Sequence, residues 1–177
     1  DEQPFQAKLD KIRQLRPAFA KDGTITAANS SSISDGASAL ILASHEAAQR
    51  HGVKPLAKML GHATHSRHPS EFTIAPVGAI EKLMKKLGWG VNDVDLFEIN
   101  EAFAAVTLMA MDDLGLPHEK VNVFGGACAQ GHPIGSTGSR IIATLIHALR
   151  TKGGKRGIAS LCIGGGEATA VAVELMD

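Results

Sequence analysis

The chain has little of several features that mark particular classes of protein. It contains only two cysteines, Cys128 and Cys162, in 177 residues, which excludes a disulfide framework and indicates reduced thiols. A reducing compartment, the cytoplasm, is therefore expected. No apolar run reaches about 18 residues and no charged segment leads into an apolar one, so the sequence predicts neither a membrane span nor a secretory signal.

An excess of charge of either sign is also missing. The 18 basic residues balance the 18 acidic ones, so no broad field attracts nucleic acid or an anionic membrane, and neither partner is expected. The spacing of His62, His65 and His68 suits neither a helix face nor a zinc knuckle, so no metal site is expected. Hydrophobic residues make up 44% of the chain. This is enough to form one buried core, or one domain plus part of a neighbour.

The apolar spacing predicts alternating helices and strands. Helices are expected over residues 5–15, 44–52, 75–87, 101–114 and 141–152, and strands over 37–43, 53–66, 93–99, 156–163 and 168–175. The strand at 37–43 is almost wholly apolar and should be buried on both faces. The last two strands join through three glycines, which predicts an antiparallel hairpin. Helices between strands, with that pair at the end, indicate a layered α/β domain with a mixed sheet.

Asn100 stands where a ligand is often bound. It follows a predicted strand, at the end of the sheet where open α/β folds commonly hold ligands, and an amide there can fix a water or an oxyanion. The structural alternative is that Asn100 caps the helix whose first turn carries Glu101. The sequence leaves both interpretations open.

His132 lies in the glycine-rich segment "GGACAQGHPIGSTGSR". This segment lacks the lysine of a phosphate-binding P-loop and the later acidic residue of a dinucleotide fingerprint. It is either a tight turn with an interior histidine or a loop, preset by Pro133, that lets another chain or a ligand come close.

Cys162 precedes a glycine triplet in "CIGGG". One interpretation is an inert buried cysteine at the corner of a hairpin. The other is a thiol that gives and takes protons, beside main-chain amides such as that of Gly164 that are free to donate to an oxygen. A base of this kind requires a neighbouring charge or dipole that lowers the pKa of the thiol.

Together, "NEAFA", "GHPIG" and "CIGGG", in that order, resemble the C-terminal half of the thiolases, and residues 15–40 and 125–140 are similar to the same family over most of their length. The resemblance implies an α/β fold of βαβαβαββ type, with a mixed five-stranded sheet flanked by helices. Residues 1–50 would be the end of the N-terminal half and its loop region, and residues 51–177 the C-terminal domain.

The resemblance also implies an activity. Thiolases are acyltransferases that interconvert two acetyl-CoA with acetoacetyl-CoA and CoA, or cleave longer 3-ketoacyl-CoA; coenzyme A thioesters are the substrates and no cofactor is expected. By the family pattern a nucleophilic cysteine lies upstream of Asp1, because Cys128 stands where the family usually has an apolar residue. The start "DEQPF" has no initiator methionine. We therefore expect the chain alone to be inactive without the N-terminal half, and the full-length protein to form homodimers or homotetramers.

The resemblance implies that the residues matching the thiolase motifs have the roles of the corresponding thiolase residues. Cys162, His132 and Asn100 would be catalytic, with His132, Asn100 and Gly164 forming the oxyanion sites. Ser31 would contact pantetheine and Phe103 would line the acyl site. The chain departs from the usual family pattern at five positions, which are Ser32, Ser34, Phe124, Gln130 and Glu167.

Two other functions compete with this one. A thiolase-like module that binds acyl-CoA or lipid without chemistry would lack the reactive groups, whereas all three are present. A Cys-His-Asn hydrolase is the other, but in papain-like enzymes the cysteine precedes the histidine and begins a helix. Cys162 follows His132 and lies in a predicted strand.

Overall fold

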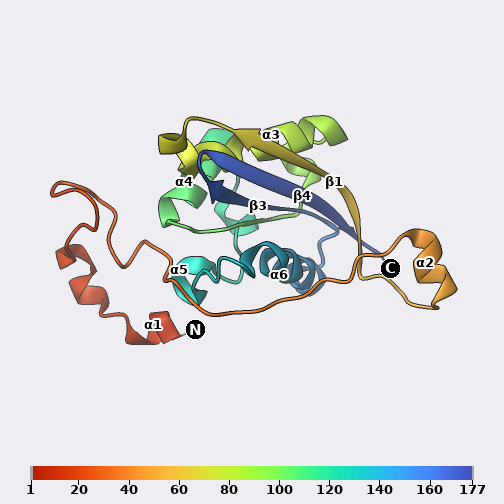
Figure 1. Cartoon of the computed structure of the whole chain (residues 1–177), viewed down its shortest axis with the longest axis horizontal. Helices are drawn as coiled ribbons and strands as arrows, with labels where there is room; N and C mark the ends of the chain where they lie inside the picture. Colours follow the sequence, from red (N-terminus) through yellow and green to blue (C-terminus); the bar gives the residue numbers. More distant parts are fainter. Residues whose placement is uncertain (1, 177) are drawn as a thin grey trace.

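A computed structural model describes residues 2–176 as a sheet between two layers of helices, with a long N-terminal segment wrapped around one side (Figure 1). The helices are α1 (Glu2–Gln6), α2 (His45–Arg50), α3 (Ala75–Leu87), α4 (Ala104–Leu114), α5 (Ala127–Gln130) and α6 (Thr137–Lys152). The strands are β1 (Ala57–Ser66), β2 (Leu96–Ile99), β3 (Arg156–Gly164) and β4 (Glu167–Leu175). Short 3₁₀ helices are η1 (Leu9–Gln14), η2 (Pro69–Ile74), η3 (Val91–Asp93) and η4 (His118–Lys120).

The sheet is mixed, as predicted. Its order is β1-β4-β3-β2, with β2 parallel to β3 and the other two pairs antiparallel. The predicted hairpin of β3 and β4 is therefore confirmed. Because β2 and β3 run the same way, the residues that follow β2 reach the same edge of the sheet as the residues at the end of β3.

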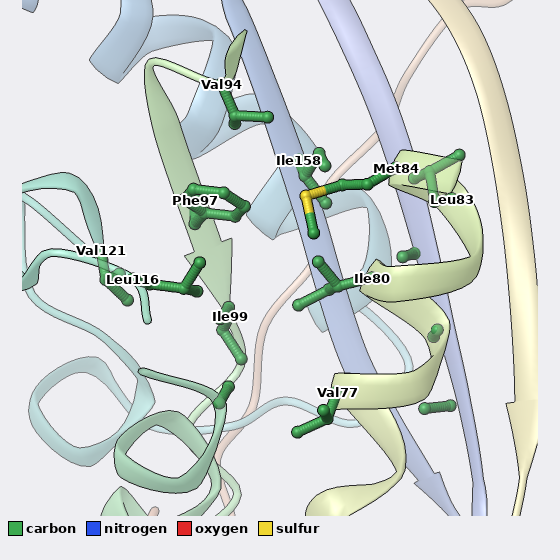
Figure 2. Close-up of a cluster of buried hydrophobic side chains, with 14 of the residues drawn as sticks. Val77, Ile80, Leu83, Met84, Val94, Phe97, Ile99, Leu116, Val121 and Ile158 are labelled. Carbon is green, nitrogen blue, oxygen red and sulfur yellow. The ribbon is translucent and has the colours of Figure 1, made fainter. Parts of the chain in front are cut away.

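The two faces of the sheet bury separate apolar clusters. Alternate residues of β2 and β3, among them Phe97, Ile99 and Ile158, pack against α3 and α4 (Figure 2). On the opposite face, Leu96 and Ala159 pack against α6. This helix-sheet-helix layering is the α/β architecture expected from the sequence.

The helix predicted over residues 5–15 is broken. The structure has α1, then two non-helical residues, then the 3₁₀ helix η1, and the apolar side chains of this segment are exposed, for example Phe5 and Leu9. An amphipathic helix is stabilised mainly by burial of its apolar face, and nothing within residues 2–176 buries this one.

The buried strand predicted over residues 37–43 is wrong for this structure. The segment is extended but pairs with no strand of the described chain, and Ile41 is 98% exposed. The segment runs alongside α6 (Figure 1). There Ser38 Oγ donates to the carbonyl of Ser136 at 2.9 Å and lies 2.6 Å from Ser139 Oγ.

The sheet has four strands, not the five that the resemblance implied. In chain order the remaining β position of the family pattern is at residues 121–123, which make only isolated bridges. Asn122 has a φ of 47°, and its side chain bonds Ile99 N and Ile99 O at 2.8 Å each. A left-handed residue cannot continue a strand, so pairing beside β2 stops there. The α/β fold class holds.

Within residues 2–176 no helix is both long enough and apolar enough to cross a membrane.

Candidate active site

The loop that carries His132 is packed against another loop of the same chain. His132 N donates to Ser32 O at 2.9 Å, and Ile33 and His132 form an isolated bridge. A Cβ on Gly36 would lie 2.7 Å from Pro133 Cγ. The segment that approaches this glycine-rich loop is residues 30–36 of the same chain, more than ninety residues earlier in the sequence. Approach of another chain or a ligand stays a prediction.

His132 is held at one ring nitrogen. Its Nδ1 lies 2.7 Å from the hydroxyl of Thr137, in the first turn of α6. Burial lowers the pKa of the imidazole, and the positive charge of Arg140 lowers it further. His132 is therefore neutral near pH 7, the form that can accept a proton.

Asn100 lies immediately after β2, beside β3. Its backbone N–H donates to Ser160 O at 2.9 Å, and the residue is only 1% exposed. The amide oxygen Oδ1 lies 3.5 Å from Arg140 Nη2, whereas Nδ2 is buried and has no hydrogen-bond partner within residues 2–176. A buried NH₂ group without a partner is costly, so this one points to a ligand or a water.

The capping alternative for Asn100 is wrong. The helix that follows begins at Ala104, and its N-cap is Phe103, which makes no side-chain cap hydrogen bond. Helix capping therefore does not explain why asparagine stands at position 100.

Cys162 lies near the end of β3, on the face that packs against α3 and α4. A β-bulge follows it, between Cys162 and Gly164, and turns Ile163 outward. Burial raises the pKa of the Cys162 thiol, and only a backbone hydrogen bond opposes the effect. The lowering that a resting thiolate requires is therefore not provided within residues 2–176.

Hairpin geometry explains two of the three glycines. Gly165 and Gly166 form the turn between β3 and β4, with φ of 62° and 90°, as a two-residue type I′ turn requires. Gly166 also abuts the backbone of Arg67, where a Cβ would clash. Gly164 has a φ of 107° and open space around it, which fits the room predicted beside Cys162.

Ser31 and Phe103 lie side by side in space. Ser31 Oγ donates to Ala102 O at 3.0 Å, and Ser30 and Phe103 form a bridge. The ring of Phe103 packs edge-on against Phe19 and Phe72, with centroids 5.8 Å and 6.3 Å away. The resemblance assigned both residues to the substrate, and their roles stay a prediction.

A network of charged and amide groups near Asn100 was missed by the sequence analysis. Glu98, in β2 and two residues before Asn100, pairs with Arg140 at 3.3 Å. Glu101 accepts from Asn122 Nδ2 at 2.9 Å and from Cys128 N at 3.0 Å. The available signal was Glu98, the one acidic residue among the apolar residues of "LFEI", since a buried carboxylate needs a partner.

The thiol of Cys128 has a raised pKa. Burial, together with the negative charge of Glu101, raises its pKa to about 12. A thiol is nucleophilic only as thiolate, so Cys128 does not suit acyl transfer, in agreement with the sequence analysis.

The structure connects the three predicted catalytic residues only in part. Arg140 contacts Asn100 directly and acts on His132 through its charge, which brings these two together around the start of α6. Cys162 is on the strand next to Asn100 but packs on the other face of the sheet. Within residues 2–176 no hydrogen bond joins the three side chains to one another, and their convergence around a thioester stays a prediction.

Two surface hollows in the described part of the chain are not lined by Asn100, His132 or Cys162. One is lined by Lys54, Leu56, Arg150 and Met176 among others. The other lies beside Asn122 and Lys152. No group of three or more His, Cys, Asp or Glu side chains able to hold a metal ion occurs in the part of the chain that the structure describes.

Comparison with known proteins places the chain in a family. Residues 53–175 match the profile "Thiolase, C-terminal domain", and residues 1–46 match "Thiolase, N-terminal domain". The chain belongs to the thiolase family.

Similar proteins carry related names. An acetyl-CoA acetyltransferase of Chromobacterium violaceum is 51% identical over 95% of the chain and 43% of its own length. A probable acetyl-CoA acetyltransferase of Dictyostelium discoideum is 50% identical over 98% of the chain and 42% of its own length. The crystal structure of human mitochondrial 3-ketoacyl-CoA thiolase superposes with a TM-score of 0.93 at 46% identity, over 97% of this chain and 43% of that one. The chain thus spans less than half the length of these relatives.

Two departures of this thiolase chain from the family pattern are packed together. Ser32 Oγ and Ser34 Oγ lie 3.1 Å apart, and a Cβ on Gly131 would clash with Ser34. Gly131 has a φ of 91°. The serine side chains therefore fill the space over Gly131, one residue before His132.

The other departures lie elsewhere. Phe124 stacks near His147, with centroids 6.1 Å apart, and Lys152 Nζ lies 5.6 Å from its ring. Glu167 begins β4 and is exposed. Nothing in the structure explains Gln130, at the end of α5.

The buried carboxyl group of Glu98 should make the stability of this thiolase depend on pH. Desolvation raises its pKa to about 7, against the opposing effect of Arg140. The folded protein therefore keeps a proton that the unfolded chain releases near pH 4.5, so this group stabilises the fold fully below that pH and the contribution is lost as pH rises to about 7. Urea unfolding at pH 4.5 to 7.5 should show this decline, and Glu98→Gln should flatten it. An identical slope in the variant would show that Glu98 is not the group responsible.

Proposed function

We propose that the chain supplies the acid/base part of a thiolase, which condenses two acetyl-CoA to acetoacetyl-CoA and CoA or cleaves a 3-ketoacyl-CoA in the reverse direction. The observation that supports this most is the buried amide of Asn100, with an unpartnered Nδ2, at the end of the strand beside Cys162. The names of the relatives support the same reaction.

In the condensation, the Cys162 thiolate removes a proton from the methyl group of acetyl-CoA. The electron pair of the C–H bond moves to the thioester oxygen, which becomes an enolate. Asn100, through a water, and His132 donate to this oxygen; a preoriented donor contributes about 3 kcal/mol to such stabilisation. His132 is neutral at rest, and a neutral imidazole still carries one N–H donor. It can donate from Nε2 to this oxygen when its Nδ1 accepts from the hydroxyl of Thr137.

The enolate carbon then attacks an acyl group carried as a thioester on a second cysteine. A carbon–carbon bond forms, the carbon–sulfur bond breaks, and the second cysteine leaves as thiolate. The amide of Gly164, with open space before it, would donate to the tetrahedral oxyanion of this step.

The raised pKa of Cys162 favours one direction at rest. A buried thiol stays protonated near pH 7, so it is ready to protonate the enolate that leaves when a 3-ketoacyl-CoA is cleaved. For condensation the thiol must first lose its proton, which goes to the CoA thiolate released when the first acetyl-CoA transfers its acetyl group to the second cysteine. Once deprotonated it is the stronger base, because basicity rises with pKa.

The second cysteine is proposed to come from the other half of a thiolase. Cys162 has the acid/base role and the pKa of Cys128 is about 12, so neither cysteine of the chain suits acyl transfer. The chain alone is then inactive. Assembly of the full-length enzyme into homodimers or homotetramers stays a prediction.

Coenzyme A thioesters are the proposed substrates. A crystal structure of human mitochondrial 3-ketoacyl-CoA thiolase in complex with CoA is similar to this chain, with a TM-score of 0.93. Side chains and main-chain amides handle every proton and charge in the proposed steps, so no resident cofactor is required. Two free thiols, Cys128 and Cys162, suit the reducing cytoplasm.

The test uses the intact protein and the 177-residue chain side by side. The intact protein should form acetoacetyl-CoA from acetyl-CoA or cleave it with CoA. The chain alone, incubated with acetyl-CoA, should gain no acetyl group on Cys162 or Cys128 by mass spectrometry. An acetyl adduct on the chain would contradict the division of roles, and an intact protein that binds CoA without turnover would favour the non-catalytic binding module.

A further inference from the structure

We propose that Arg140, held by Glu98, is a positioning residue that fixes the orientation of the Asn100 amide, so that its NH₂ group faces the reacting oxygen. This rests on the proposed function. Neither Arg140 nor Glu98 takes part in the steps given above, yet they form the only buried ion pair in the described part of the chain.

The two arms of one guanidinium reach two residues that are two positions apart, Glu98 in β2 and Asn100 immediately after it. Nη1 lies 3.3 Å from Glu98 Oε1, and Nη2 lies 3.5 Å from Asn100 Oδ1. Residues two apart on a strand point to the same face, which here is the face toward α6. Arg140 comes from the first turn of α6 and so reaches both from one place.

An arginine contact decides which way an amide points. The two ends of an asparagine amide have nearly the same shape, so packing alone does not choose between them. A guanidinium has five donors and no acceptor. The guanidinium therefore donates to Oδ1 and repels an NH₂ group. Nδ2 of Asn100 is consequently turned away from Arg140.

The amide that results is directed but unpartnered. Nδ2 is buried and has no hydrogen-bond partner within residues 2–176, although such a group normally finds one. Arg140 thus orients Asn100 Nδ2 so that it can donate to an oxygen of the substrate or of a water bound with it. A flipped amide would present an acceptor to a developing oxyanion, which is repulsive.

Above its pKa of about 7 Glu98 is a carboxylate, and it then holds the guanidinium in place by charge and hydrogen bond. It is 2% exposed, and the Arg140 side chain is 16% exposed. A guanidinium bonded at two of its nitrogens, to Glu98 and to Asn100, has little freedom to rotate. The other charged group that acts on Arg140 is Glu101, whose carboxylate is itself occupied by Asn122 and Cys128.

The first experiment is a kinetic double-mutant cycle in the intact enzyme, with Arg140→Met, Asn100→Ala and the double variant. Arg140→Met should lower kcat by about tenfold to a hundredfold, the scale of a misplaced catalytic group, with KM changed by less than about threefold. In the Asn100→Ala background the same change should cost less than about twofold, because the residue acts through Asn100. Multiplicative losses would overturn the proposal.

Arg156→Met is the matched control. It breaks another arginine–carboxylate pair, Arg156 with Glu174 at 2.7 Å, in which Arg156 makes no hydrogen bond to an Asn or Gln side chain within residues 2–176. Its kcat should be unchanged. An equal loss of kcat in this control would mean that Arg140 has a merely structural role.

The second experiment needs no turnover and keeps the two proposals separable. In a Glu98→Gln background Arg140 lacks its anion, so Asn100→Asp supplies a new one and should raise the Tm by about 2–4 °C or more. In a Glu98→Gln, Arg140→Met background the same Asn100→Asp change should lower the Tm, because it buries an unpaired charge. The same sign in both backgrounds would show that Arg140 does not act on residue 100, whether or not the protein is a thiolase.

Discussion

Replacement of Cys162 by serine in the intact enzyme is expected to lower turnover at least about a hundredfold, the usual scale for loss of an acid/base group. A hydroxyl is a far weaker acid than a thiol, so serine neither protonates the enolate nor forms the base that removes the methyl proton. The substitution keeps the size of the side chain within one atom, in a site that is buried against α3 and α4. Turnover of both acetoacetyl-CoA cleavage and synthesis measures the effect.

Cys128→Ala is the control for this prediction. Cys128 is the other free thiol of the chain, and its pKa of about 12 leaves it uncharged. This variant should keep nearly full turnover, whereas His132→Ala should fall with Cys162→Ser. Activity that survives Cys162→Ser would refute the acid/base assignment.

Replacement of Gly166 by alanine is expected to reduce the free energy of unfolding of the intact protein by at least about 3 kcal/mol. Two effects add. The φ of 90° strains any L-residue, at about 1–2 kcal/mol, and the new Cβ would clash with the backbone carbonyl of Arg67, which cannot rotate away. That carbonyl belongs to the link between β1 and η2, and Arg67 N donates to Gly166 O at 2.9 Å. Urea unfolding measures the change.

Gly165→Ala separates the two effects. Gly165 has a φ of 62° in the same turn, but open space surrounds it. This variant carries the backbone strain without the clash and should lose only about 1–2 kcal/mol. Equal losses at the two positions would mean that the approach of Arg67 contributes nothing.

Local patterns in the sequence predicted the parts of the fold that local interactions decide. The spacing of apolar residues from Ala79 to Leu87, followed by Gly88, gave a helix and its end, and α3 ends there with Gly88 at a φ of 69°. Alternation and the glycine triplet gave the β3–β4 hairpin. Both patterns concern residues at most a few positions apart, where periodicity and backbone φ are set by the residues themselves.

The same reasoning failed where the outcome depends on a distant partner. Residues 37–43 have the composition of a buried strand, but no strand of the described chain pairs with them. A strand is stabilised by neighbours in the sheet, and composition does not say which neighbours are present. At residues 121–123 the side chain of Asn122 takes the place of a backbone ladder, which no apolar pattern reveals.

The sequence by itself determined the α/β class and the order of the motifs, and it predicted Asn100, His132 and Cys162 as the catalytic groups. Only the tertiary structure decided that Ser32 supports the backbone of His132, that Arg140 meets Glu98 and Asn100, and that burial raises rather than lowers the pKa of Cys162. The reason is physical: reactivity and orientation depend on desolvation and on charges a few ångströms away, and those neighbours come from segments far apart in the chain.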